Sequence, residues 1–152
     1  VSFRLTYYLY GESLGVYPAL PSENRDEERK VIWNDLVTIL NGLSNIGKQV
    51  YFVVQPPELP RHIEKLVFWK SESSERTQGV TRRWWDQRNR FVTERLSDLS
   101  KDIIVVDATD QFCDQLWCYG DDTKGFLYAD DDHVSVYGAL LIVNDWVLRS
   151  NN

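Results

Sequence analysis

The sequence lacks methionine altogether and has no apolar run long enough to cross a bilayer. The longest apolar run near the C-terminus, residues 139–143, ends at Asn144 and falls far short of the roughly 20 residues that a transmembrane helix needs. No signal peptide follows Val1. Because the chain begins with Val rather than Met, we expect a piece of a longer protein, whose upstream part could hold targeting information or membrane helices.

Basic residues are scarce relative to acidic ones. The chain has 17 Lys and Arg against 23 Asp and Glu, a formal net charge of -6 and a pI of about 4.9. No nucleic-acid partner is expected, because neutralising phosphates requires a surplus of Lys and Arg. With 43% hydrophobic residues, the 152 residues suffice for a single domain, residues 1–152, around one core.

Cysteine is almost absent, since Cys113 and Cys118 are the only two in the chain. Two thiols without a second suitably spaced pair are a poor zinc site. Their spacing lets the intervening loop fold back and close a disulfide, which would indicate an oxidising compartment. Two unlinked buried thiols are the alternative, and the spacing alone does not decide between them.

Strands alternate with helices along the chain. Aromatic and β-branched runs predict strands, helical spacing of apolar residues predicts helices, and Pro, Gly and polar clusters predict loops. This order is typical of an α/β sandwich with a mainly parallel sheet, in which sites gather beyond the carboxyl ends of the strands. The predicted strands are residues 3–10, 49–54 and 103–106; the predicted helices run from about 22–26 to Gly47 and over 62–69, 81–99 and 135–149; the predicted loops include 11–24, 55–60 and 70–79.

Periodicity also predicts the helix ends and the buried helix faces. Ser22, Asn24 or Asp26 could cap the first long helix, with Glu27 and Glu28 favourable in its first turn. The residues predicted to face inward are Ile32, Leu36, Ile39, Leu40 and Leu43 in the first long helix, Trp85, Phe91, Val92, Leu96 and Leu99 in the second, and Ala139, Ile142, Val143, Trp146 and Val147 in the last.

Asp130 and His133 have the spacing of an acid–base pair. A catalytic His takes a proton from the nucleophile on one ring nitrogen, while a carboxylate at the other nitrogen fixes the tautomer and stabilises the imidazolium. An Asp three residues earlier in a tight turn can reach Nδ1 of His133, and Ser135 could cap the helix that follows. The acidic run 130–132 has two other interpretations, a solvated turn and a divalent-cation site.

Several motifs follow one another in the C-terminal part of the chain. They are a strand that ends at Asp107, the Cys pair, the Leu127-Tyr128 step, Asp130-x-x-His133 and the helix start Ser135-x-x-Gly138-Ala139. In this order they resemble the end of an SGNH hydrolase domain, specifically the SGNH domains fused to acyltransferase-3 membrane proteins, the OafA/OafB-like O-acetyltransferases of bacterial surface glycans. Residues 4–11 and 47–58 resemble the middle of such a domain.

The resemblance implies a fold, a site and a location. The fold would be a three-layer α/β sandwich of the SGNH/flavodoxin type, of which this chain is the incomplete C-terminal portion. Asp130 and His133 would be the Asp and His of a Ser-His-Asp triad, and Cys113 and Cys118 would form a loop disulfide. The site would need no metal or cofactor. Its partners would be an acyl donor supplied by a membrane acyltransferase domain and a glycan acceptor, on the periplasmic side of an inner-membrane protein.

The nucleophile is the main departure from the family pattern, which places it in a Gly-Asp-Ser motif after the first strand. The nearest sequence here is Gly11-Glu12-Ser13. Pro18 and Pro21 follow where a helix with free amides should hold the oxyanion, and Ser13 precedes His133 by only 120 residues. We therefore expect the nucleophile to lie outside this chain, with Ser13 as the less favoured alternative, and we assign no oxyanion-hole residue.

The sequence thus predicts serine-type transfer of an acyl group, with acetyl expected, to bacterial cell-surface polysaccharide. A carbohydrate esterase would use the same site with water as the acceptor. The alternative from another class is a non-catalytic glycan-binding module with a vestigial Asp–His pair. Residues 82–88 could form its stacking face, although an amphipathic helix with Trp inward and Arg on the rim accounts for them more simply.

Overall fold

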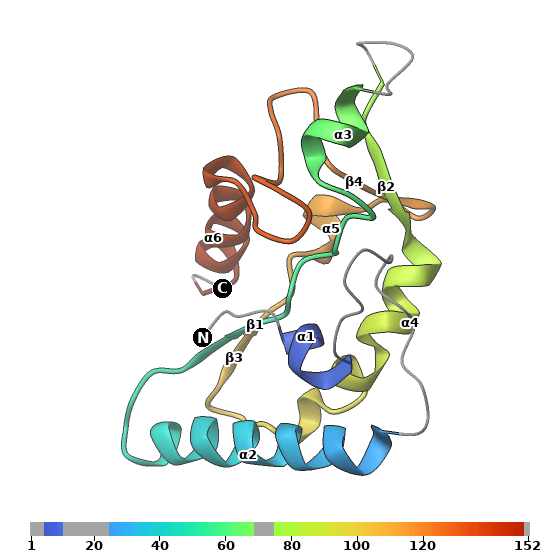
Figure 1. Cartoon of the computed structure of the whole chain (residues 1–152). Coiled ribbons are helices and arrows are strands. Elements are labelled where there is room, and N and C mark those ends of the chain that lie inside the picture. Colours follow the sequence, from blue (N-terminus) through green and yellow to red (C-terminus); the bar gives the residue numbers. More distant parts are fainter. Residues whose placement is uncertain (1–4, 11–24, 69–74, 151–152) are drawn as a thin grey trace. The chain divides into compact units, whose positions relative to one another are not determined.

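The computed structural model describes residues 5–10, 25–68 and 75–150 (Figure 1). They belong to two compact units, Val1–Gln55 with Asp86–Val106 and Pro56–Trp85 with Asp107–Asn152. Each unit has its own two-stranded sheet and its own hydrophobic core. A single domain over the whole chain stays a prediction. None of the described helices is both long enough and apolar enough to span a membrane.

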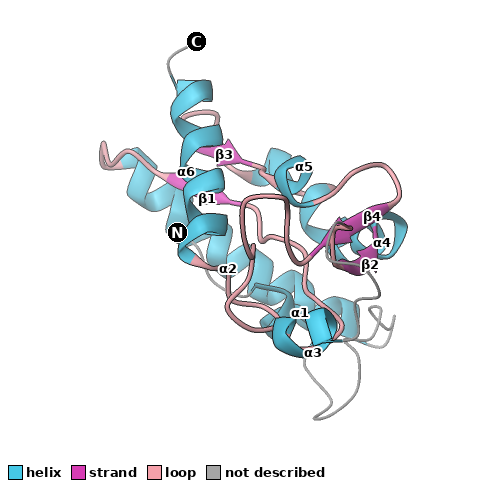
Figure 2. Ribbon diagram, turned by 90° about the horizontal axis from the view of Figure 1, so that it is seen from above, coloured by secondary structure: helices cyan, strands magenta, loops and turns pink. Residues whose placement is uncertain are grey.

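A parallel pair of strands forms the centre of the first unit. Strand β1 (Tyr51–Val53) lies beside β3 (Ile104–Val106) (Figure 2). Their parallel pairing places Phe52 opposite Val105. Hydrogen bonds from Ile104 N to Val50 O and from Val54 N to Val106 O extend the pairing at both ends. Both strands lie inside their predicted ranges, because short apolar runs bounded by turn residues suit strands that are buried by parallel pairing.

Helix α2 (Asp26–Asn45) contributes Trp33, which is 1% exposed, to the core of the first unit. The Trp33 ring meets Phe52 edge-on at 6.0 Å between ring centroids. Its Nε1 donates a 2.8 Å hydrogen bond to Oδ2 of Asp98. The apolar part of the indole is therefore buried while its polar nitrogen has a partner, the condition under which a tryptophan can occupy a core.

The face of α2 predicted to be buried is partly wrong. Leu40 is buried as expected, but Ile39 and Leu43 are 61% and 38% exposed. The buried residues are instead Arg29, Trp33 and Leu40, which rotates the inward face toward Trp33. A tryptophan buries more apolar area than either aliphatic side chain, so its burial determines which face of the helix turns inward.

The two ends of α2 differ in how well they were predicted. Its N-cap residue is Arg25, which makes no side-chain cap hydrogen bond, so the assignment of Asp26 as a cap is wrong; Ser22 and Asn24 lie outside the described residues. At the other end Gly47, with φ 79°, closes a Schellman motif through hydrogen bonds from Lys48 N to Leu43 O and from Gly47 N to Ser44 O. The predicted stop at Gly47 is confirmed.

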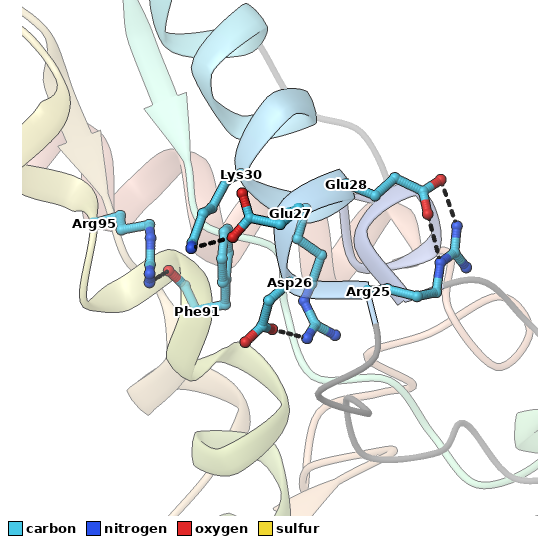
Figure 3. Close-up of polar contacts among 8 residues, drawn as sticks. Arg25, Asp26, Glu27, Glu28, Lys30, Phe91 and Arg95 are labelled. Atoms are coloured by element: carbon cyan, nitrogen blue, oxygen red, sulfur yellow. Dashed lines mark hydrogen bonds and ion pairs between the residues drawn. The ribbon is translucent and has the colours of Figure 1, made fainter.

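The first turn of α2 carries paired charges. Asp26, Glu27 and Glu28 lie in this turn, where acidic side chains interact favourably with the positive end of the helix dipole. Glu28 binds Arg25 and Glu27 binds Lys30 at 2.7 Å each, while Asp26 binds Arg29 (Figure 3). Most of these side chains are exposed, so each pair contributes little stability.

The described part of the strand predicted over residues 3–10 is helical instead. The described part is helix α1 (Leu5–Tyr10), in which Leu5 and Leu9 are buried and Tyr7 and Tyr8 are exposed. An aromatic run of this length fits either element, and the i, i+4 spacing of the two leucines is helical. The core of the first unit buries both leucines on one side, and this tertiary packing decides in favour of the helix.

The second unit contains an antiparallel pair, β2 (Gln78–Thr81) and β4 (Trp117–Tyr119), around which α3 (Ile63–Phe68), α5 (Thr109–Phe112) and α6 (Val136–Ser150) complete the core (Figure 1). Helices were predicted at α3 and α6. The predicted loop at 70–79 and the loop expected between the two Cys residues are wrong where β2 and β4 form, because such short strands depend on distant pairing rather than on local propensity. Helix α5 is a short helix just before Cys113.

The second predicted long helix is shorter than expected. Helix α4 (Arg82–Thr93) ends before a separate 3₁₀ turn, η2 (Leu96–Asp98). Trp85, Val92 and Leu99 are buried as predicted, whereas Arg88 is fully buried rather than on the rim. In α6, Val143 and Val147 are each 43% exposed, so their predicted inward orientation is wrong.

The parallel pair and the surrounding helices confirm the α/β class. Each sheet of the described residues has two strands, so the three-layer sandwich stays a prediction.

Candidate active site

The segment from Asp130 to His133 forms a closed turn in the second unit. Ala129 N donates to the His133 carbonyl at 2.8 Å, and Tyr128 and Val134 form an isolated antiparallel bridge at its base. Oδ1 of Asp130 accepts the backbone N–H groups of Asp132 at 2.9 Å and His133 at 2.7 Å. Asp suits this position because its short carboxylate reaches backbone amides two and three residues ahead.

This turn brings the ring of His133 against two carboxylates. Nδ1 of His133 lies 2.8 Å from Oδ2 of Asp130 and 2.8 Å from Oδ1 of Asp132. In the neutral ring the proton then belongs on Nδ1, and Nε2 carries the lone pair that can accept a proton. The His133 side chain is 77% exposed, so a substrate or a second segment can reach it.

The pKa of Asp130 lies well below its usual range. Burial by itself raises the pKa of this carboxyl, but hydrogen bonds from the backbone amides of His133 and Asp132 and from the His133 ring outweigh burial. Asp130 therefore stays ionised at neutral pH. A fixed negative charge at Nδ1 is the arrangement that stabilises a protonated imidazole ring.

Residues 56–63, which begin with the two prolines Pro56 and Pro57, pack against this turn. Leu59 N donates to the Asp131 carbonyl at 2.7 Å, and Ile63 N donates to the Asp130 carbonyl at 3.1 Å. These two backbone hydrogen bonds hold the turn from outside, so its conformation does not depend on Asp130 alone. Glu58, which is 1% exposed, lies in this segment as the sequence placed it, and we give it no catalytic role.

Tyr128 links the same two segments from inside the core. Its hydroxyl donates a 2.6 Å hydrogen bond to the Pro57 carbonyl, and its ring packs at 5.7 Å between centroids from Phe112. Burial, with a smaller effect of the Glu58 charge, raises the pKa of Tyr128 well above its ordinary value. The hydroxyl therefore remains a donor at any ordinary pH. The sequence held no signal for this hydrogen bond.

Ser135 and Gly138 attach the turn to helix α6. Oγ of Ser135 accepts the Gly138 N–H at 3.0 Å, so the predicted cap is confirmed, and it donates to the Phe126 carbonyl at 2.6 Å. The Leu127 carbonyl accepts Ser135 N at 2.9 Å, and a Cβ on Gly138 would lie 2.2 Å from that same oxygen. Glycine at 138 lets the helix start this close to the turn.

The predicted disulfide between Cys113 and Cys118 is present. Asp114 organises the loop that it closes: Oδ1 accepts the backbone amides of Leu116 and Trp117, and Oδ2 accepts the Tyr119 hydroxyl at 2.6 Å. These bonds, led by that from Tyr119, lower the pKa of Asp114 to about 2. The loop is therefore held by the covalent disulfide and by the exposed Asp114 carboxylate, which accepts three hydrogen bonds.

We find no nucleophile beside His133 among the residues that the structure describes. Ser13, with Gly11 and Glu12, lies outside the described residues. Ser135 is close in sequence, but its hydroxyl caps α6 and donates to a backbone carbonyl. We assign neither a nucleophile nor an oxyanion hole to any described residue.

The atoms around His133 also resemble the ligand set of a metal. Asp130, Asp132 and His133 each offer one ligand atom within 4.8 Å of the others. Nδ1 already contacts both carboxylates, so an ion bound through Nδ1 would have to displace the hydrogen bond to Asp130 and the ion pair with Asp132. The arrangement as it stands suits proton transfer, and the cation interpretation remains the alternative.

A cavity of about 280 Å³ in the first unit carries none of this chemistry. Charged side chains of α2, of α4 and of the two residues after Thr93 line it together with Phe91. Arg29 binds Asp26 and Arg90 binds Glu94, so most of its charges neutralise one another.

The sequence of the chain matches the model of a known protein family. The model of the family "SGNH domain (fused to AT3 domains)" matches residues 1–147. No curated protein and no solved structure gives a significant match.

Proposed function

Because this chain belongs to the family of SGNH domains that are fused to AT3 domains, we propose that it supplies the His and Asp of a serine-type acyl-transfer site. The family supports acyl-transfer or esterase chemistry in general. The observation that carries the residue assignment is the 2.8 Å contact between Asp130 Oδ2 and Nδ1 of His133, on an imidazole that is 77% exposed.

In the first half of the proposed reaction, a serine hydroxyl attacks the carbonyl carbon of an acyl donor. Nε2 of His133 takes the hydroxyl proton, and Asp130 stabilises the resulting imidazolium. The tetrahedral intermediate collapses as the bond to the donor breaks, and His133 gives its proton to the leaving group. The acyl group is then on the serine and His133 is neutral again.

In the second half, a hydroxyl group of a glycan attacks the acyl-serine. His133 takes the proton of this hydroxyl and returns it to the serine oxygen as the acyl–serine bond breaks. The product is an O-acylated glycan, and the enzyme returns to its starting state. We propose acetyl as the acyl group and cell-surface polysaccharide as the acceptor, with the domain on the extracytoplasmic side of a membrane-bound parent. Water in place of the glycan would make the same site an esterase.

We place the nucleophile upstream of this chain rather than at Ser13. If Ser13 were the nucleophile, this chain alone would react stoichiometrically with a serine-directed fluorophosphonate probe, and Ser13→Ala would abolish the labelling. We expect no labelling of the chain, and we expect Ser13→Ala to change the activity of the full-length protein by no more than a few-fold.

The full-length protein tests the proposal. We expect it to be labelled by the fluorophosphonate probe and to transfer a radiolabelled acetyl group to acceptor glycan, and we expect His133→Ala to abolish transfer. His62→Ala is the matched control, because it removes the only other histidine and should leave transfer unchanged. Near-normal transfer by His133→Ala would refute the assignment. Acetate release without glycan labelling would indicate the esterase, and no labelling at all would favour the glycan-binding module.

A further inference from the structure

Two carboxylates, rather than one, face the same nitrogen of His133. Oδ2 of Asp130 and Oδ1 of Asp132 each lie 2.8 Å from Nδ1. Nδ1 carries a single proton. Its contact with Asp130 is a hydrogen bond, whereas its contact with Asp132 is an ion pair when His133 is protonated. The Asp–x–x–His spacing predicts the contact of Asp130 with His133 but not that of Asp132.

The two carboxylates differ in their surroundings. Asp130 uses its other oxygen to accept two backbone amides of the turn, and its side chain is 31% exposed. The side chain of Asp132 is only 7% exposed. Water screens a buried charge less than an exposed one, so the attraction between Asp132 and a protonated His133 retains more of its strength. Asp130 therefore combines a turn-forming and an orienting role, whereas the contact of Asp132 is the more shielded of the two.

We propose that Asp132 is a second positioning residue that holds the His133 ring together with Asp130. This rests on the proposed function for its catalytic consequence, but the contact itself can be tested without any activity. If the role is shared, loss of either carboxylate leaves the other on Nδ1. Neutralising the only Asp of a triad lowers the rate by a factor of about 10⁴. Asp130→Asn and Asp132→Asn should each lower kcat/KM of the full-length protein by much less than this factor, and the double variant should approach it.

Histidine titration by NMR tests the contact in this chain. Its two histidines, His62 and His133, make the ring-proton signals simple to assign by single substitution. We expect Asp130→Asn and Asp132→Asn each to lower the titration midpoint of His133 by about 0.5 pH unit, and the double variant to lower it further. The His62 signal serves as the internal reference. None of the variants substitutes Glu58 or His62, two titratable residues of the segment that packs against the turn.

Asp131→Asn is the matched control. It makes the same chemical change one residue away, and the Asp131 carboxylate, which is exposed, makes no polar contact with the described residues. Its effect on the His133 midpoint should be less than half that of Asp132→Asn. A chelator should change neither midpoint, whereas a chelator-dependent shift would indicate a bound metal and overturn the positioning role.

Equal shifts for Asp131→Asn and Asp132→Asn would also overturn the proposal. If Asp132→Asn fails to fold, as judged by circular dichroism, Asp132→Glu replaces it: the retained charge should keep the His133 midpoint within about 0.2 pH unit of wild type, and a shift as large as that of Asp130→Asn would count against the role. Normal titration shifts without acyl transfer would refute the proposed function and leave the positioning contact intact.

Discussion

Tyr128 and Pro57, 71 residues apart in sequence, are joined by a 2.6 Å hydrogen bond from the phenol to the proline carbonyl. Tyr128 directly precedes the turn that carries Asp130 and His133, and Pro57 lies in the segment whose backbone holds that turn. The bond is buried, so neither group can exchange its partner for water at low cost. The position of the turn from Asp130 to His133 therefore depends on a contact between distant parts of the sequence.

Tyr128→Phe should destabilise the protein by about 1–3 kcal/mol, because it leaves the Pro57 carbonyl buried without this donor. Chemical denaturation with urea would measure the loss. Tyr119→Phe is the control: it removes a hydrogen bond of the same length, 2.6 Å, but to the exposed Asp114 carboxylate, which water can solvate. Equal losses for the two variants would show that burial of the Tyr128 bond has no special effect.

Gly138→Ala and Gly42→Ala should change stability in opposite directions. A Cβ at 138 would lie 2.2 Å from the Leu127 carbonyl oxygen, so the start of α6 must shift, at a cost of roughly 1–3 kcal/mol. At Gly42, inside α2, nothing lies within 4 Å of the new Cβ, and alanine should stabilise by about 0.5–1 kcal/mol through its helix propensity. Thermal unfolding of both variants gives the comparison. A neutral Gly138→Ala would mean that the close approach to Leu127 is absent in solution.

Reduction of the bond between Cys113 and Cys118 should lower the free energy of unfolding by roughly 2 kcal/mol, the chain-entropy value for so short a loop. Unfolding with and without reductant measures this, and the double variant Cys113→Ala/Cys118→Ala should be insensitive to the reductant. Intact mass after alkylation under non-reducing, denaturing conditions checks the bond itself. Two alkylated thiols in that experiment would contradict the disulfide.

Stability should fall as the pH drops from about 4 to about 2. The folded pKa of Asp114, about 2, lies below its ordinary value of 3.8, so its contribution is complete above 3.8 and disappears as the pH approaches 2. The lowered pKa of Asp130 acts in the same direction. Urea midpoints at pH 5 and pH 2.5 should therefore differ less for Asp114→Asn than for wild type. Asp102→Asn is the control, because its carboxylate makes no polar contact with the described residues, and it should keep the wild-type difference.

Local features of the site were predictable from residue types alone. The Asp130–His133 turn, the Ser135 cap and the stop at Gly47 each depend on contacts within five residues, for which the side chain and its spacing contain the information. The Cys pair was less determined, because its five-residue separation allows a disulfide but equally fits two unlinked thiols, and only the family resemblance favoured the bond. The contact of Asp132 with Nδ1 of His133 is also local, but the sequence did not predict it. The acidic run 130–132 offers three carboxylates, and their spacing alone does not show that Asp132 contacts the His133 ring in addition to Asp130.

Distant contacts decided the rest. Residues 5–10 form a helix because the core of the first unit buries Leu5 and Leu9 together, which an aromatic run cannot reveal. Strands β2 and β4 exist only through their pairing with each other, about 40 residues apart. The sequence by itself determined the turn that brings Asp130 to His133, since a short carboxylate and nearby amides suffice. Tertiary structure decided how that turn is held, through Pro57, Leu59 and Ile63, because a hydrogen bond between distant residues forms only once the chain has buried both partners.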